Sequence, residues 1–195
     1  MQRAGPPLIA LLITFLSSSA FADLRLPALV SDGMVLQQNS SVKIWGWAIE
    51  GQLVDVTASW IHSGEQLATV TAHGGRWSLE IDTPPAGGPY EIEIATAEER
   101  LTVSNILIGE VWLCAGQSNM AMPIVGFQSQ PVEGSQEAMI GSHDSALRLF
   151  AVKTQLAAQP AADILGEWRS ANPESISRFS AIGYFFGHRL RETLD

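Results

Sequence analysis

Ser118, in the run Gly116-Gln117-Ser118-Asn119-Met120, is the residue of this sequence best placed by its neighbours to do chemistry. It follows the apolar run Val111-Trp112-Leu113-Cys114, which is typical of a strand buried on both faces in a parallel sheet. We expect Gly116 to take backbone angles closed to other residues, and Ser118 to lie just past the strand's carboxyl end, where open α/β sheets bind ligands. A hydroxyl there could attack a carbonyl carbon while its own N–H binds the developing oxyanion. On composition alone, a polar turn with a helix cap explains the same residues.

A serine nucleophile needs a base, and the histidines of the sequence do not supply an obvious one. They are His62, His73, His143 and His188. We expect the first two to be surface residues of a strand-rich region, the third to be solvated, and the fourth to lie on a helix. A triad is recognised by geometry rather than order, so spacing alone excludes none of them. They lack the short intervals of zinc sites, and no glycine-rich phosphate loop is present, so no metal or cofactor is expected.

The elements that must position Ser118 change character near Arg100. Before it, apolar and polar residues alternate in short runs bounded by Gly and Pro, at residues 42–47, 54–58, 77–81 and 90–94. Such runs predict strands of an antiparallel β-sandwich. We expect the tryptophans of this region to fill its core, with a sugar-stacking platform as the alternative; they are Trp45, Trp47, Trp60 and Trp77.

After Arg100 the pattern predicts part of an α/β three-layer domain. Continuous apolar runs indicate strands at residues 106–108, 111–114 and 147–152. Apolar residues spaced by three or four predict an amphipathic helix from Phe179 to Leu190, which Ser177 or Ser180 could cap. These strands are fewer than a complete α/β sheet contains, so we expect a truncated domain. The predicted organisation is a signal peptide at 1–22, a β-sandwich at 23–102 and the N-terminal part of an α/β domain at 103–195.

The N-terminus and the net charge limit the partners. Arg3, an apolar run at 8–16 and the ending Ala20-Phe21-Ala22 predict a secretory signal peptide that is too short to span a bilayer, and hence export to the periplasm or the medium. With 11 Lys and Arg against 20 Asp and Glu, a net charge of −9 argues against nucleic-acid binding. Cys114 is the one cysteine, so no intrachain disulfide forms, and its apolar neighbours favour core packing over a catalytic thiol.

Six motifs together resemble one known family in order and spacing. They are Leu26-Pro27 with Ser31-Asp32-Gly33-Met34-Val35-Leu36-Gln37, Ile44-Trp45-Gly46-Trp47-Ala48, Gly87-Gly88-Pro89-Tyr90, Gly109-Glu110-Val111-Trp112, Gly116-Gln117-Ser118-Asn119-Met120, and Phe179-Ser180-Ala181 with Gly183-Tyr184-Phe185-Phe186-Gly187. The sequence is similar to the sialate O-acetylesterase family over nearly its whole length after the leader.

This resemblance implies a function and roles for several residues. It implies a β-sandwich beside an SGNH-type hydrolase domain, with Ser118 as the nucleophile that attacks an acetyl ester of a sugar. The family's histidine and its acidic partner lie further along than Asp195, so we expect these 195 residues alone to be inactive. Gln117 and Asn119 are candidate substrate or oxyanion donors, with a role for Asn119 in holding the turn as the alternative. Glu110 either orders the serine loop or is a surface residue. The alternative is a carbohydrate-binding β-sandwich module with a vestigial esterase segment.

Overall fold

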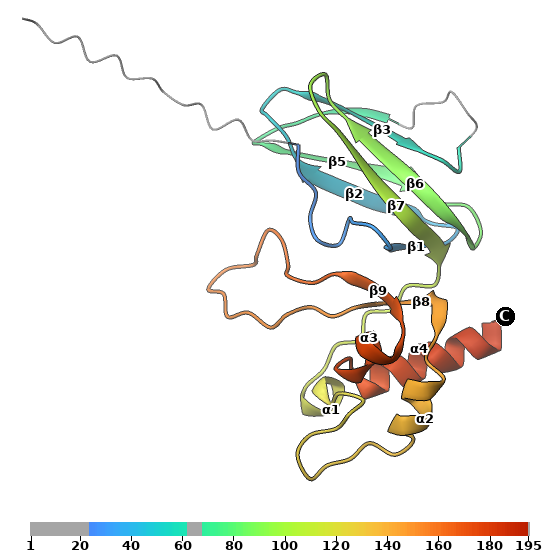
Figure 1. Ribbon diagram of the computed structural model, residues 1–195. Helices are drawn as coiled ribbons and strands as arrows, with labels where there is room; N and C mark the ends of the chain where they lie inside the picture. Colours follow the sequence, from blue (N-terminus) through green and yellow to red (C-terminus); the bar gives the residue numbers. More distant parts are fainter. Residues whose placement is uncertain (1–23, 62–67, 195) are drawn as a thin grey trace, which may run out of the picture.

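The computed structural model describes residues 24–61 and 68–194 and shows two groups of elements (Figure 1). Strands β1 to β7 form one group, and the four helices with β8 and β9 form the other. The predicted signal peptide and His62 lie outside the described residues. No helix in the described ranges is both long enough and apolar enough to cross a membrane.

The first group consists of a five-stranded and a two-stranded sheet. The larger sheet has the order β1 (Val35–Gln37), β7 (Arg100–Gly109), β6 (Gly87–Ala95), β3 (Leu53–Ala58), β4 (Ala68–Thr71). Its pairs are antiparallel except β1 with β7, which is parallel. The smaller sheet pairs β2 (Ser41–Trp47) with β5 (Arg76–Asp82) in antiparallel register. All four strands that the alternating runs predict are therefore confirmed as strands.

Both sheets contribute to one apolar core. Ile44 and Ile81 come from the smaller sheet, and Val56, Ile94 and Ile106 from the larger one, and each is at most 1% exposed. The alternation of apolar residues along each strand directs these side chains inward and the polar ones outward. Burying an aliphatic side chain of this size stabilises the fold by about 1.5–3 kcal/mol, so this core holds the two sheets together.

Gly46 leaves room for a close approach between β2 and its neighbours. The backbone N–H and C=O of Trp47 exchange hydrogen bonds with those of Arg25, at 2.8 and 2.9 Å. A Cβ at position 46 would lie 2.9 Å from the Trp77 ring and would also collide with the carbonyl oxygen of Arg25. We therefore expect Gly46→Ala to lower the free energy of unfolding by about 1–3 kcal/mol, measured by urea titration.

Gly109→Ala is the matched control, because no heavy atom lies within 4 Å of a Cβ built at that strand position. Its unfolding free energy should change by no more than about 0.5 kcal/mol. Equal unfolding midpoints for the two variants would show that the Gly46 contact does not limit stability.

The second group has a smaller core of its own. Strands β8 (Asp144–Phe150) and β9 (Trp168–Ala171) pair in antiparallel register. The helices are α1 (Ser118–Ala121), α2 (Ser135–Ile140), α3 (Pro173–Ser177) and α4 (Ala181–Leu194). Buried residues from the loop after α1, from β8, α3 and α4 meet in one cluster that includes Ile124, Leu149, Ile176 and Tyr184. The predicted C-terminal helix is thus confirmed as α4, and the Ser180 hydroxyl accepts the Gly183 N–H at 3.1 Å, as a cap would.

The predicted strands around residue 110 need correction. Residues 106–108 belong to β7 of the first group, which runs unbroken from Arg100 to Gly109, so the predicted division after residue 102 falls inside this strand. Residues 111–114 form no strand; Leu113 is 90% exposed, and Cys114 is exposed rather than packed in a core. An apolar run becomes a buried strand only where neighbouring strands pair with it. In the described chain β8 and β9 pair only with each other, and no strand pairs with this run.

Arg148 of β8 connects the two groups. Its guanidinium donates to the Gly33 carbonyl at 3.4 Å and to the Asn105 side-chain oxygen at 3.0 Å, both in the first group, and to the Ser145 carbonyl at 2.7 Å. All three acceptors are neutral, and partial burial lowers the pKa of Arg148. Trp168 adds a second connection, because its indole N–H donates to the Leu29 carbonyl at 2.9 Å.

Arg148→Ala should lower the free energy of unfolding by about 1–3 kcal/mol, because it removes the donor for the buried Gly33 carbonyl as well as two exposed hydrogen bonds. Urea titration followed by tryptophan fluorescence measures this change. Arg189→Ala is the control, since this exposed arginine of α4 pairs only with Glu192 in the described chain. An effect as small as that of Arg189→Ala would mean that the Arg148 contacts are not needed to join the groups.

Candidate active site

Ser118 is exposed and begins the single-turn helix α1. The turn is closed by the Ala121 N–H on the Gln117 carbonyl at 3.0 Å and the Met122 N–H on the Asn119 carbonyl at 3.3 Å. The predicted position at the end of a parallel strand is wrong, because β7 ends at Gly109 and the intervening residues form no strand. The hydroxyl is therefore accessible to a substrate, but no sheet edge aligns it.

The chain that follows Ser118 is held against the start of α4. The Ser180 hydroxyl lies 3.3 Å from the sulfur of Met120, and the Ala181 N–H donates to the Met122 carbonyl at 2.8 Å. One step further, the N–H of the buried Ile124 donates to the Phe179 carbonyl at 3.1 Å. The structure thus brings the motifs at 116–120 and 179–181, far apart in sequence, into direct contact.

The chain that leads to Ser118 is held at its other end by Glu110. This carboxylate accepts the side-chain amides of Gln38 at 2.9 Å and Gln37 at 3.3 Å, and the Gln37 side-chain oxygen accepts the Val111 N–H at 2.9 Å. Glu110 is exposed, so it is at the same time a surface residue and a tether for the start of the segment. Its partners lie in and just after β1, more than 70 positions earlier in the sequence.

Gly116 has a different role from the expected one. Its backbone is not in the left-handed region, unlike that of glycines such as Gly33 and Gly126. A Cβ at this position would lie 3.0 Å from the Cβ of Met120. The glycine therefore provides space for the tight return of the chain over Met120 rather than an unusual backbone angle.

No histidine contacts Ser118 in the part of the chain that the structure describes. His188 stacks on Tyr184 with ring centroids 5.7 Å apart, and its Nε2 lies 3.5 Å from Glu192. His73 lies 3.9 Å from Glu50 on the surface of the first group, and His143 is exposed. A serine hydroxyl without a base is a weak nucleophile, and among the described residues no histidine is placed to take the Ser118 proton.

Gln117 and Asn119 flank the serine with exposed side chains. Across residues 24–61 and 68–194, no hydrogen bond holds either side-chain amide, so their role as substrate or oxyanion donors stays a prediction. In the same ranges no three His, Cys, Asp or Glu side chains gather in a way that could hold a metal ion.

Comparison with known proteins gives these features a context. No protein-family signature matches the chain. It is 29% identical to the sialate O-acetylesterase of Homo sapiens over 206 residues, which covers 96% of this chain and 38% of that protein. The sialate O-acetylesterase of Rattus norvegicus is also 29% identical, over 96% of this chain and 37% of its own. The chain therefore spans somewhat over a third of the length of these relatives.

A solved structure agrees with the sequence comparison. A carbohydrate acetylesterase from Xanthomonas citri superposes with a TM-score of 0.79 and 33% identity, over 88% of this chain and 38% of that one. The chain, with its mixed sheet and few helices, is thus similar in fold to a carbohydrate acetylesterase. Within that class, the resemblance to the sialate O-acetylesterase family is confirmed.

Proposed function

We propose that this chain carries the nucleophile of a serine esterase that removes O-acetyl groups from sugars. The similarity to acetylesterases in sequence and in structure supports this function most directly. The geometry adds support, because Ser118 is exposed on a turn whose two flanks are fixed by Glu110 and by the Met120–Ser180 contact.

In the proposed reaction the Ser118 hydroxyl oxygen attacks the acetyl carbonyl carbon while a base takes its proton. The tetrahedral oxyanion is held by the Ser118 backbone N–H, together with the Gln117 or Asn119 side chain. The intermediate collapses to an acetyl-serine and releases the sugar, whose alkoxide receives the proton. Water then attacks the acetyl-serine, and acetate leaves with the serine hydroxyl restored.

The base and its acidic partner are proposed to lie outside these 195 residues. The absence of any histidine contact to Ser118 in the described chain supports this, as does the greater length of the relatives. We further propose that the first group is a β-sandwich that extends to Gly109, that the second group is part of an SGNH-type α/β domain, and that the protein is exported after removal of residues 1–22.

Acetate release tests this function. The 195-residue chain and a longer chain from the same gene are incubated with O-acetylated sialic acid and with acetylated xylose oligomers. The longer chain should release acetate from at least one of them, and the 195-residue chain should be about 10³-fold slower or worse. Failure of the longer chain on every acetylated sugar would refute the esterase, whereas equal rates would place the base within these residues.

A second candidate is a carbohydrate-binding module whose serine segment is vestigial. The independent core of the first group, shared by its two sheets, favours such a module. Glycan binding without acetate release by the longer chain would support this candidate against the esterase. Acetate release that depends on Ser118 would exclude it as the sole function.

A further inference from the structure

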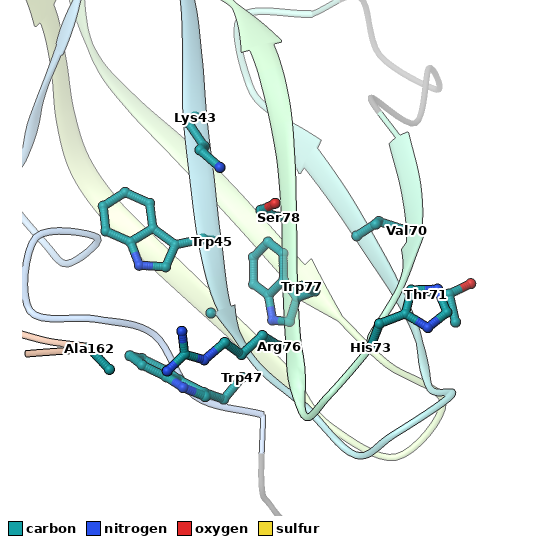
Figure 2. Close-up of a pocket in the computed structure, with 11 residues that line it drawn as sticks. Lys43, Trp45, Trp47, Val70, Thr71, His73, Arg76, Trp77, Ser78 and Ala162 are labelled. Atoms are coloured by element: carbon teal, nitrogen blue, oxygen red, sulfur yellow. The ribbon is translucent and has the colours of Figure 1, made fainter.

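A hollow of about 540 Å³ opens on the outer face of the two-stranded sheet, in the first group of elements (Figure 2). Lys43, Trp45 and Trp47 of β2 and Arg76 of β5 line it, with Ala162 approaching from the long connection between β8 and β9. This volume lies within the range of pockets that bind small ligands or oligosaccharide segments. None of these residues contributes to the Ser118 turn.

The charges that line the hollow are all basic, although the chain carries a net charge of −9. Lys43 and Arg76 are its two cationic side chains, and His73, which lies 3.9 Å from Glu50, also lines it. Among residues 24–61 and 68–194, no ion pair involves Lys43 or Arg76. Glu80 lies opposite Lys43 in the strand register but does not line the hollow. A basic surface on an acidic protein is complementary to an anion of low charge density, while the net charge repels dense polyanions such as nucleic acids.

The aromatic residues of the hollow give it an apolar floor. Trp45 and Trp47 are both partly exposed and lie two positions apart on β2, so their side chains share the outer face. Arg25 places its guanidinium 4.4 Å from the ring centroid of Trp47, which holds that indole in place. Flat, fixed indoles stack on the apolar faces of sugar rings at little entropic cost.

Trp77 belongs to the core, but packing in the core does not account for its indole N–H. It is 3% exposed and lines the hollow, and its indole N–H has no acceptor among the described residues. An unsatisfied buried donor costs about 1–3 kcal/mol and is rare in cores, so an acceptor from a ligand or a bound water at this place would remove the cost.

We propose that this hollow binds a segment of an acidic polysaccharide with carboxylated sugar rings. Lys43 and Arg76 are separated along the strand pair, because Lys43 lies four residues from Trp47, the partner of Arg76. Four residues of strand span about 13 Å, so the two cations meet carboxylates on different rings, with the rings between them over the indoles. The occupant is thus an oligosaccharide with at least two carboxylates rather than a single sugar. The site is independent of Ser118 and of the proposed esterase activity.

Isothermal titration of the 195-residue chain tests this site with the galacturonic acid trimer, the galacturonic acid monomer and the neutral galactose trimer. The acidic trimer should bind at least tenfold more tightly than either of the others, and raising NaCl from 50 to 300 mM should weaken it several-fold. The double variant Lys43→Gln/Arg76→Gln should lose at least tenfold in affinity, and Trp45→Ala a similar factor. Arg100→Gln, at an exposed arginine of the larger sheet, should bind within twofold of the original.

The double variant changes only outward-facing charges, so it keeps the test valid if Trp45→Ala unfolds; circular dichroism shows whether each variant is folded. Equal binding of the acidic and neutral trimers would overturn the acidic class of ligand. Binding of the acidic trimer that Lys43→Gln/Arg76→Gln leaves unchanged would overturn the site, and so would the absence of binding by the folded chain. Ser118→Ala should leave the titration unchanged.

Discussion

Ser118→Ala is expected to reduce acetyl-ester hydrolysis by the longer chain by about 10⁴-fold to 10⁶-fold. Without the hydroxyl no acetyl-enzyme forms, and the remaining oxyanion donors and binding contacts supply only a small part of the rate enhancement. The loss should appear in kcat, while KM for the acetylated sugar changes little, because the hydroxyl contributes little to ground-state binding. Initial rates of acetate release at several substrate concentrations separate the two constants.

Ser180→Ala is the matched control for this variant. Ser180 lies beside the same turn, where its hydroxyl contacts the sulfur of Met120 and accepts the Gly183 N–H. Its loss should cost about 1 kcal/mol of stability, as for other helix caps, and reduce the rate by less than tenfold. Full activity of Ser118→Ala would refute the assignment of the nucleophile, and a loss of similar size in both variants would indicate a structural effect on the turn.

Tyr184→Ala should lower the free energy of unfolding by about 3–5 kcal/mol. Tyr184 is 2% exposed and belongs to the core cluster with Ile124 and Ile176. Its ring also contacts Phe185 and stacks on His188. Since Ile124 directly follows the serine turn, the cavity left by the ring should also loosen the attachment of that turn to α4. Urea titration measures the stability, and proteolysis at residues 118–130 under native conditions measures the attachment.

Tyr184→Phe separates the packing of the ring from the chemistry of its hydroxyl. Burial and the negative charge of Asp144 raise the pKa of Tyr184 above its ordinary value near 10. Because the folded-state pKa lies above the unfolded-state value, Tyr184 contributes to the free energy of unfolding through its protonated hydroxyl. This contribution is complete below about pH 10 and is lost as the pH rises through the folded-state pKa. Tyr184→Phe should therefore resemble the original at pH 8 and lose less stability between pH 10 and 11.

Two results would contradict this account of Tyr184. An unfolding free energy of Tyr184→Ala within about 0.5 kcal/mol of the original would show that the second core does not depend on this ring. Identical losses of stability above pH 10 in Tyr184→Phe and in the original would assign the alkaline transition to other groups.

The elements with a regular apolar period were predictable from the sequence. Alternation at residues 42–47 and 90–94 predicted strands, and the spacing of Phe179, Ile182 and Phe186 predicted the helix that forms α4. The spacing of apolar residues shows which face of a strand or helix is apolar. Such an element forms wherever a core covers that face. The alternation also shows which side chains of β2 face outward, because Lys43, Trp45 and Trp47 alternate with more buried residues. From the sequence, these tryptophans were expected mainly in the core.

The spacing of apolar residues does not show which elements pack or pair with one another. Only the tertiary structure decided those partners. The apolar run at residues 111–114 predicted a buried strand, yet a strand requires a neighbour to exchange hydrogen bonds with, and no strand of the described chain pairs with these residues. Glu110 contacts Gln38, 72 positions away in the sequence, and Arg148 contacts Gly33, 115 positions away. No local sequence pattern indicates such contacts. The sequence alone identified Ser118 as the candidate nucleophile by its motif. The exposure of Ser118 and the contacts that hold both sides of its turn depend on residues far apart in the sequence, which only folding brings together.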